Sequence, residues 1–411
     1  MTAPGTDRIS GPGHSFGRRS FLIGAGAGTA VTATGLNAAN HRTDGAPVQA
    51  GSRVVDFRGA NQAGIYRPAV QQAQACFASF KVLVRGRSEL KGLLQILTVK
   101  GSQLAIGRAA GALPANSGVL GEDVPADSFT MTVGLAGSVF DNPSFGLAHQ
   151  KPVGLTSMKV FRNDILDPAW TGGDLILQLC ADSTDMIHYA LRDIARATRG
   201  LMQLQWKING FHSAPRPAGS PRNLFGYKDG IVNPAPEESL VWLTKDSGQP
   251  DWAVGGTFLV VRLIRMRVEL WDRVGLRKQD NMIGRHRATG APLGAANETD
   301  TPDYANDPKG RIIPLDAHIR LANPRTKDTD RSRFLRRGYN YDLGLDPDGN
   351  LHSGLIFAAY QQNIQHQFEA TQIRLINEPL TDYVQPFGGG YFIALPGVTS
   401  PDGHLGATLF T

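Results

Sequence analysis

Short runs in which apolar and polar residues alternate are spread along most of the chain, and they predict β-strands separated by helices. Residues 74–84 alternate and are rich in β-forming side chains, and residues 129–139 follow the same pattern. Between them, residues 89–98 repeat apolar positions at helical spacing. The pattern further predicts strands at 175–181 and 202–211 and an amphipathic helix at 184–198.

A similar order of elements recurs in the second half of the chain. The halves therefore look like weak structural repeats, an inference that depends on element order alone because no strong sequence identity links them. Residues 290–311 are rich in Gly, Pro, Asn and Asp, which predicts an irregular surface loop. The predicted strands are 257–270, 355–360 and 391–395, and the predicted helices are 277–285 and 366–376.

Composition is that of a globular protein with a sizeable core. The 411 residues, of which 41% are hydrophobic, are enough for two domains of ordinary size. The formal net charge is +6, and basic and acidic residues are interspersed along the chain. So mild and mixed a charge does not favour a nucleic-acid partner.

The only cysteines, Cys76 and Cys180, stand in apolar, strand-like runs and are predicted to be core residues. Zinc and iron–sulfur sites need cysteines at closer spacing, so these two do not form such a site by themselves. A disulfide between them is possible if the protein resides in an oxidising compartment.

The first forty residues resemble a twin-arginine export signal. Arg18 and Arg19 are followed by Phe21 and by a modestly apolar, Gly- and Ala-rich run that ends near Leu36. The run is too short and too polar for a stable membrane span, and an arginine-containing tail is the alternative interpretation. We expect a leader at 1–40, a flexible linker at 41–65, and export of the folded protein to the periplasm, cell envelope or exterior, not insertion as an integral membrane protein.

Asp229 is the first candidate for chemistry, because it lies between glycines in a segment, 226–230, that reads Gly-Tyr-Lys-Asp-Gly. Glycine permits backbone conformations closed to other residues and leaves the carboxylate without bulky neighbours. The arrangement suits a general acid/base. It equally suits a plain turn, in which Asp-Gly is a common dipeptide.

His318 is the second candidate among ten histidines. It stands in the polar, cationic segment 316–325, and Arg336 and Arg337 follow shortly after. Such cations would suit the propionates of haem, and a single neutral imidazole is the ligand that haem iron needs from the protein. The other histidines have no second ligand at a metal-binding spacing such as His-x-x-x-His.

Several separated segments resemble the dye-decolorizing peroxidase family. Residues 226–230 fit its Gly-x-x-Asp-Gly signature, and the match extends over 223–234. Residues 316–341 and 388–392 resemble the same family in the same order. The resemblance covers about residues 65–411 and is particularly close to an exported bacterial branch associated with iron uptake.

The resemblance implies the fold and the cofactor. It implies an α+β protein of two ferredoxin-like domains, of the dimeric α+β barrel type, with antiparallel sheets and helices packed on them. The N-terminal domain would span 66–220 and the haem-binding domain 221–411. One haem b would be held in each chain, in the second domain between sheet and helices.

The resemblance also implies residue roles. His318 would be the proximal iron ligand and Asp229 the distal acid/base that moves a proton between the peroxide oxygens. Arg336, preferred over its neighbour Arg337 by its spacing from the histidine, would stabilise the negative charge on the departing oxygen and approach a propionate. Gly230, Ile231 and Val232 would pass over the haem, and Asn323, Pro324 and Arg325 would line its proximal side.

One position departs from the family pattern. Many members carry an acid after the tyrosine of a Leu-x-Phe-x-x-Tyr strand, and this acid hydrogen-bonds the proximal histidine. Here Tyr360 is followed by amides and Asn363 stands in that region. If Asn363 fills the place of the acid, the imidazole donates less charge to iron, and a higher reduction potential is expected.

The expected activity is a haem peroxidase that uses hydrogen peroxide and dyes, phenols or other small one-electron donors. A haem-handling protein that releases iron from haem, with partners in an iron-uptake system, is the second hypothesis, and a non-haem hydrolase that uses Asp229 with a histidine is the third. The sequence does not decide whether the protein forms a homo-oligomer. Donors too bulky to reach the haem could pass electrons through aromatic residues at the surface. The candidates, chosen by residue type alone, are Trp242, Trp252, Trp271, Tyr339 and Tyr360.

Overall fold

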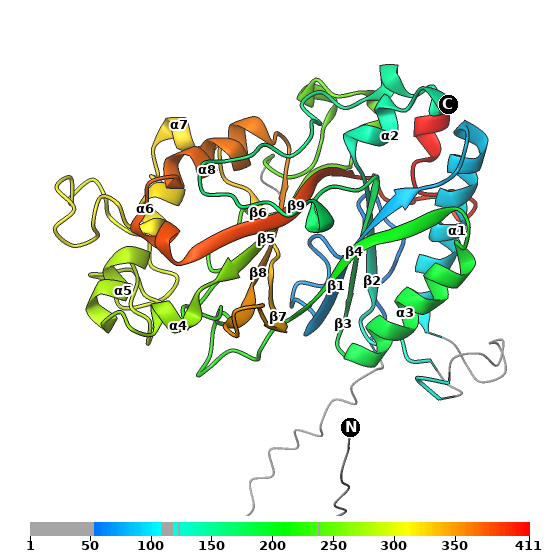
Figure 1. The fold of residues 1–411 in the computed structure, drawn as a ribbon. Coiled ribbons are helices and arrows are strands. Elements are labelled where there is room, and N and C mark those ends of the chain that lie inside the picture. Colours follow the sequence, from blue (N-terminus) through cyan, green and yellow to red (C-terminus); the bar gives the residue numbers. More distant parts are fainter. Residues whose placement is uncertain (1–52, 108–117, 122–123, 237–238) are drawn as a thin grey trace, which may run out of the picture. The chain divides into compact units, whose positions relative to one another are not determined.

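An antiparallel β-sheet runs through both halves of the chain and closes on itself (Figure 1). The computed structural model describes residues 53–107, 118–121, 124–236 and 239–411, all of them within one compact unit. The strands are β1 (Gln74–Val82), β2 (Thr130–Leu135), β3 (Leu175–Ala181), β4 (Met202–Phe211), β5 (Thr257–Met266), β6 (Leu335–Arg336), β7 (Tyr339–Leu345), β8 (Leu351–Gln361) and β9 (Val384–Ala394).

The order of strands explains the closure. Neighbours in the sheet are β5-β9-β2-β3-β1-β4-β7-β8, and β8 also pairs with β5. The short strand β6 pairs with β8 just beyond β7, so Arg337 and Gly338 interrupt one edge of the ring. The predicted antiparallel α+β architecture is thus present as a barrel-like closed sheet with helices on its outside.

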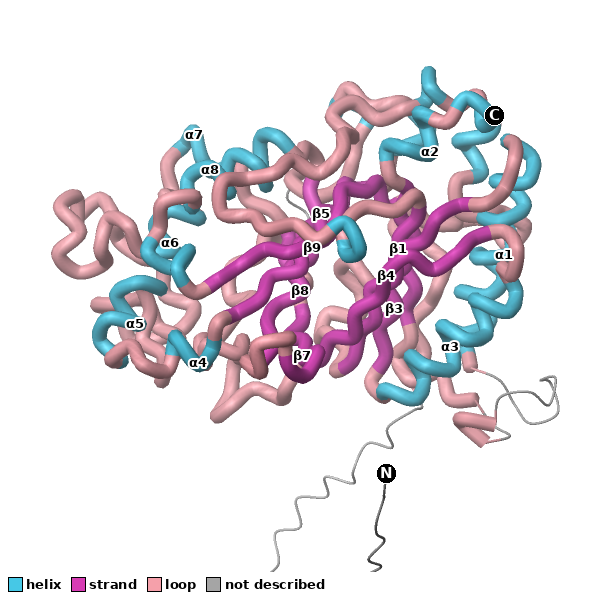
Figure 2. The backbone as a smooth tube through the Cα atoms, viewed as in Figure 1, coloured by secondary structure: helices cyan, strands magenta, loops and turns pink. Residues whose placement is uncertain are grey.

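Helices lie on either side of the strands, as Figure 2 shows. In the first half, α1 and α3 turn fully buried apolar faces toward the sheet, as the periodicity predicted. Helices in the second half are much shorter. The helices are α1 (Arg87–Ile106), α2 (Gly137–Asp141), α3 (Thr184–Ala197), α4 (Val268–Trp271), α5 (Leu276–Ile283), α6 (His318–Ala322), α7 (Lys327–Asp330) and α8 (Ala370–Leu375).

Several expected boundaries were wrong. The predicted strand 129–139 ends at Leu135, because the chain turns into α2 at Gly137. The predicted strand 257–270 ends at Met266, because the residues that follow form α4 and bury Trp271. The Trp271 ring stacks on Phe225 with centroids 4.5 Å apart, and its Nε1 donates a hydrogen bond to the Phe225 carbonyl. The helix predicted at 366–376 begins as a π-helical turn, Gln365–Glu369, before α8.

The cysteines do not pair. Cys76 on β1 lies opposite Leu179, whereas Cys180 on β3 lies opposite Ala75, so the register puts the two thiols on opposite faces of the sheet. Cys76 packs under the helices and Cys180 packs inside the barrel, and both are free. Burial raises the pKa of the Cys76 thiol to about 12, so this thiol stays protonated at neutral pH.

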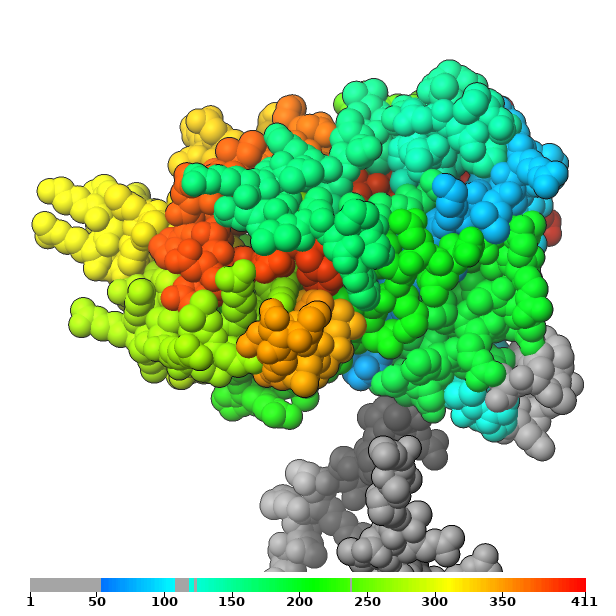
Figure 3. All heavy atoms as spheres, in the orientation of Figure 1, coloured from blue at the N-terminus to red at the C-terminus, as the bar shows by residue number. Residues whose placement is uncertain are grey.

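The segment 290–311 is irregular, as its composition predicted, and leads into a lobe that projects from the body in yellow (Figure 3). It is nevertheless anchored, because Glu298 accepts hydrogen bonds from the backbone and side chain of Ser220 and forms an ion pair with Lys228. Among the helices of the described residues, none is long and apolar enough to cross a membrane.

Candidate functional site

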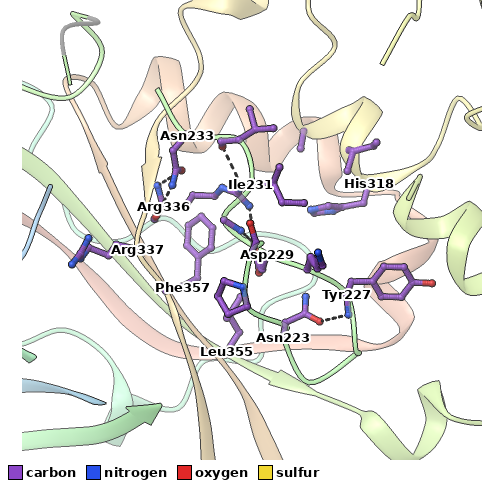
Figure 4. A pocket seen from close by; sticks show the side chains of 18 of the residues that line it. Asn223, Tyr227, Asp229, Ile231, Asn233, His318, Arg336, Arg337, Leu355 and Phe357 are labelled. Carbon is purple, nitrogen blue, oxygen red and sulfur yellow. Dashed lines mark hydrogen bonds and ion pairs between the residues drawn. The ribbon is translucent and has the colours of Figure 1, made fainter. Parts of the chain in front are cut away.

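A cavity of about 1070 Å³ opens in the second half of the barrel. Its walls come mainly from the segment after β4, from β5, β6 and β8, and from α6 and the turn after α8, and residues 65–73 of the first half also line it. Asp229, His318 and Arg336 all line it, although they are far apart in the sequence (Figure 4). The fold therefore brings together the three residues that the sequence singled out.

Asp229 sits on a turn that the sequence encodes locally. Gly226 and Gly230 have φ angles of 84° and 78°, in the left-handed region that other residues avoid. The Asn223 side-chain oxygen accepts hydrogen bonds from the backbone N–H groups of Phe225 and Tyr227, at 3.1 and 3.2 Å. Residues 226–230 therefore form a turn, and this turn also presents the Asp229 carboxylate to the cavity.

Arg336 is the cation that meets this carboxylate. Its Nη1 lies 3.1 Å from Asp229 Oδ1, and its Nη2 donates to the Val232 carbonyl at 3.2 Å. The Asn233 side chain fixes the Arg336 backbone through both its N–H and its carbonyl, at 2.9 and 3.1 Å. About a third of each charged side chain remains accessible, so the pair can still meet a ligand.

Arg337 has a different environment. It points away from Asp229 (Figure 4), and its Nη2 donates to the Pro68 carbonyl and to Gln72 Oε1, both at 3.1 Å. Only 6% of the residue is exposed. Arg337 also lines the cavity, but its hydrogen bonds tie the first half of the chain to the edge of the barrel, and Arg336 is the one of the two arginines that contacts Asp229.

His318 is the first residue of α6. Its Nδ1 lies 2.7 Å from Glu378 Oε2, an arrangement that leaves Nε2 as the free ring nitrogen. Burial by itself lowers the pKa of the His318 imidazole, but the Glu378 carboxylate outweighs it and the pKa lies above its usual value. A carboxylate that orients an imidazole in this way is typical of metal-ligating histidines.

The prediction for Asn363 was wrong. Its side-chain oxygen accepts a hydrogen bond from the backbone N–H of His366, at 2.8 Å, at the start of the π-helical turn. The acid that meets His318 comes instead from Glu378, sixty positions along the chain. The expected rise in reduction potential, which depended on Asn363, is therefore no longer expected. No sequence spacing identified Glu378 as the partner of His318.

A second histidine, His212, also lines the cavity, although it has no second ligand at a metal-binding spacing in the sequence. Its Nε2 lies 2.6 Å from the Gly338 carbonyl and 3.1 Å from Gln71 Nε2. The ring also meets Tyr339 edge to face, with centroids 4.8 Å apart. Burial lowers the pKa of His212, so this histidine is held neutral by its surroundings, without a carboxylate to orient it.

The remaining candidates fall into two groups. Gly230, Ile231 and Val232 line the cavity together with Asn323 and Arg325. Arg325 has a φ of 58°, which is uncommon for a residue other than glycine. Pro324 is not among the described residues that line the cavity.

The aromatic candidates for surface relays are mostly interior residues. Trp252, Trp271, Tyr339 and Tyr360 are each less than 5% exposed, and only Trp242 is half-buried. Sequence reasoning missed a further aromatic at the site, Tyr227, which lines the cavity. Its hydroxyl donates a 2.5 Å hydrogen bond to Asp280 Oδ1.

Comparison with family models matches most of the chain. Residues 62–212 match the model described as Dyp-type peroxidase, N-terminal. Residues 220–399 match the model described as Dyp-type peroxidase, C-terminal. Together these segments contain every residue of the site described above.

Individual proteins give the same result. A deferrochelatase of Escherichia coli O6:K15:H31 is 43% identical over 411 residues, 95% of this chain and 96% of the relative. The structure of a DyP-type peroxidase from Cellulomonas bogoriensis has a TM-score of 0.80 and 34% identity, with 88% of this chain and 99% of that chain covered. Ferric DtpA from Streptomyces lividans has a TM-score of 0.79 and 30% identity, with 88% and 98% covered.

Proposed function

The chain belongs to the Dyp-type peroxidase family, and on that premise we propose that its cavity binds haem and reduces hydrogen peroxide with electrons from small-molecule donors. One observation carries the proposal. A histidine oriented by a carboxylate and an aspartate–arginine pair face the same cavity, His318 with Glu378 and Asp229 with Arg336. One haem b per chain is the expected stoichiometry.

The residues present fit haem. The cavity volume suits a large, flat cofactor, and Leu355 and Phe357 give it apolar walls. An added Cβ at Gly230 would meet nothing within 4 Å, so the turn leaves open space beside Asp229. His318 Nε2 would ligate the iron, and Arg325 and Arg336 would face the propionates.

Haem, when bound, supplies the iron centre that cleaves the peroxide O–O bond and accepts electrons from donors. Asp229 takes the proton from one peroxide oxygen and delivers it to the other, so that the second oxygen departs as water. The Arg336 guanidinium stabilises the negative charge that develops on the departing oxygen. Glu378 holds the Nδ1 proton of His318, which fixes the ring and keeps Nε2 directed at the iron.

The overall reaction balances with two donors. Each donor loses one electron and one proton, and the peroxide takes up both electrons and both protons to give two water molecules. Asp229 needs to carry only one proton at a time, and its hydrogen bond from the Gly230 N–H, at 2.7 Å, holds the carboxylate between transfers.

The two-domain organisation supports the same assignment. In the first half β1, α1, β2, β3, α3 and β4 give the strand order β2-β3-β1-β4, and the second half repeats it as β7-β8-β5-β9. This is the order of a ferredoxin-like unit, so we assign such units to 66–220 and 221–411. The proposed leader at 1–40 and residues 41–52 of the proposed linker lie outside the described residues, and export by the twin-arginine route rests on the sequence resemblance alone. Residues 53–65 are not a flexible linker, because Phe57 and Ile65 are buried in the core and the Gln62 side chain hydrogen-bonds the backbone of Val133.

A second function is favoured by the relatives. The Escherichia coli deferrochelatase covers nearly the whole chain at 43% identity. The name of that relative denotes removal of iron, and release of iron from haem for an uptake system is the corresponding proposal here. Both functions need His318, but only peroxide cleavage needs the proton transfer by Asp229.

The experiment starts with protein purified from a haem-replete host. We expect a Soret band that shifts when peroxide is added, and turnover with a neutral phenol. Asp229→Asn should keep the Soret band but lower kcat/KM for peroxide by about 10²- to 10⁴-fold. Iron trapped by a chelator during incubation with haem measures the second function. Protein without a Soret band would overturn both proposals, and full peroxidase activity in Asp229→Asn would overturn the role of Asp229.

A further inference from the structure

The strand segment that carries Arg336 lacks a neighbouring strand on one of its sides. β6 and β7 pair with β8 along the other side. Among the described residues, β4 pairs with β7 at a single position, where Phe211 lies opposite Asn340. The next residue, His212, donates its backbone N–H to the Ala73 carbonyl, at 2.7 Å, and not to β7. The main chain that leads from Arg336 to Asn340 therefore needs other hydrogen-bond partners on this side.

Two side chains from the first half of the chain supply such partners at Gly338. Its carbonyl oxygen lies 2.6 Å from His212 Nε2 and 2.8 Å from Gln71 Nε2. Because a carbonyl oxygen only accepts hydrogen bonds, Nε2 of His212 carries the ring proton, and both lone pairs of the oxygen are used. The two nitrogens approach each other to 3.1 Å because they share this acceptor. We call Gln71 and His212 the edge clamp.

The edge clamp and β8 together fix the position of Gly338. An added Cβ at this residue would lie 2.7 Å from the Ile356 carbonyl oxygen on β8, so only glycine allows so close an approach. The His212 ring cannot turn freely either, since it meets Tyr339 edge to face with centroids 4.8 Å apart. The Gly338 carbonyl is therefore held by the first half of the chain while its own strand lies against β8.

Arg336 is held on the same side of the strand. Residues 336, 338 and 340 alternate along it, so the main-chain groups that do not pair with β8 face the same neighbour. The Asn233 side chain meets the N–H and the carbonyl of Arg336, at 2.9 and 3.1 Å (Figure 4). The edge clamp follows two residues later, and β4 follows two residues after that. Side chains thus replace a neighbouring strand next to Arg336.

The guanidinium of Arg336 depends on this part of the main chain for its place. Its Nη1 lies 3.1 Å from Asp229 Oδ1, at the end of a long side chain. A misplacement of about 1 Å is enough to slow a reaction that depends on a positioned group by about 10²-fold. Loss of the edge clamp would leave the Gly338 carbonyl, two residues from Arg336, without these donors.

We propose that the edge clamp is a positioning device for peroxide cleavage. Gln71 and His212 hold the Gly338 carbonyl, and the main chain held in this way keeps the Arg336 guanidinium directed at the peroxide. The inference rests on the proposed peroxidase function and adds to it two positioning residues. Both come from the first half of the chain, so the half that packs also sets the geometry of the half that binds.

The test compares haem-loaded wild type with the variant Gln71→Leu/His212→Ala. We expect kcat/KM for peroxide to fall about tenfold. The constant for a phenolic donor should stay near the wild-type value, because Arg336 acts in cleavage of the O–O bond and not in electron transfer. Fluoride binds ferric haem where peroxide binds and accepts a hydrogen bond from a cation there. Its Kd, measured from the absorption spectrum, should rise about fivefold.

Two control variants separate positioning from general loss of stability. His212→Gln keeps an N–H donor in the clamp and should retain most of the peroxide constant, whereas His212→Ala should not. Arg337→Leu breaks buried hydrogen bonds next to the clamp but leaves both of its donors, so it should lower stability without a change in the peroxide constant. Urea unfolding measures the stability of each variant.

The Arg336→Leu background provides the sharpest outcome. The clamp variant should cause no further loss of peroxide reactivity there, because the clamp acts through Arg336. Additive losses, or wild-type peroxide and fluoride constants in the clamp variant, would overturn the proposal. If the double variant does not fold, Gln71→Leu alone should show the same pattern at about threefold, and wild-type constants would again overturn it. Wild-type protein that loads haem but does not react with peroxide would refute the proposed peroxidase function instead.

Discussion

The two halves of the barrel use the same strand order for opposite purposes. In the first half, α1 and α3 are 20 and 14 residues long and press fully buried apolar faces onto the sheet. In the second half, β5 and β7 are joined by helices of four to eight residues, and a cavity of about 1070 Å³ stays open against the sheet. The length and polarity of the connections, more than the sheet, decide which half packs and which half binds.

This difference has an energetic consequence. A long amphipathic helix stabilises the fold by burial of apolar surface. Short helices and turns instead hold polar groups at defined positions, as Asn223 and Asn233 do around Asp229 and Arg336. Substitutions in the first half should therefore change the free energy of unfolding, and substitutions around the cavity should change haem binding or catalysis.

The largest effect is expected from His318→Ala. Loss of the iron ligand should remove most of the bound haem and abolish peroxidase activity. The free energy of unfolding of the apoprotein should fall by about 1–3 kcal/mol, because the buried Glu378 carboxylate loses its partner. The pyridine haemochrome assay measures the haem content. The matched control is His212→Ala, which removes the other histidine of the cavity and should leave haem bound. The reverse result would assign the iron to His212.

The adjacent arginines provide the next test. Arg336→Leu should lower kcat/KM for peroxide by about 10²- to 10³-fold, because the charge on the departing oxygen loses its cation. Arg337→Leu should leave that constant nearly unchanged but destabilise the fold by about 1–3 kcal/mol, since it breaks buried hydrogen bonds to Pro68 and Gln72. Stopped-flow kinetics measures the reaction of both variants with peroxide, and urea unfolding measures their stability. Similar effects of both variants on peroxide kinetics would contradict it.

A core substitution in the first half should show the opposite pattern. Leu93 on α1 is fully buried in the apolar layer between helix and sheet. Leu93→Ala should lower the free energy of unfolding by about 2–5 kcal/mol, through lost burial and the cavity left behind. Haem content and kcat/KM at a temperature well below the unfolding transition should match wild type. A loss of activity without a loss of stability would contradict the claim that the first half serves packing and the second half serves binding.

The sequence predicted more of the packing half than of the site. Helical spacing located α3 closely, because burial of one face imposes a period on the residues themselves. The strands β1 and β3 are buried on both faces and were located by their short runs of apolar and β-forming residues. Residues 267–270 were misassigned to a strand, because the apolar side chains around Trp271 alternate as in a strand while the backbone turns into α4 to stack Trp271 on Phe225.

Site residues could be predicted only where a local sequence pattern marks them. The glycines around Asp229 were visible because a left-handed turn requires them. Glu378 was not, since its contact with His318 depends on how α6 and the turn after α8 come together. Asn363 was chosen in its place on family spacing, and a helix start uses it instead.

A smaller effect is expected from Glu378→Gln. The amide still contacts His318 but carries no charge, so the ring loses the partner that orients it and raises its basicity. We expect peroxidase activity or haem affinity to fall by about 10- to 100-fold. The reduction potential, measured by spectroelectrochemistry, should rise. Asn363→Asp, the matched variant at the position first suspected, should leave the potential unchanged.

The smallest effect concerns the ion pair that anchors the segment 290–311 to the site. Burial alone raises the pKa of Glu298, but hydrogen bonds from Lys228 and Ser220 outweigh it, so the folded pKa lies below the usual value. Ionised Glu298 therefore stabilises the fold above its unfolded pKa of about 4.3, and this contribution is lost as pH falls through the lower, folded pKa. The difference in unfolding free energy between wild type and Glu298→Gln should be constant near neutral pH and shrink below about pH 4. A difference that stays constant through the acid range would show that the segment is held by its backbone contacts, and that the binding half of the barrel does not need this charge.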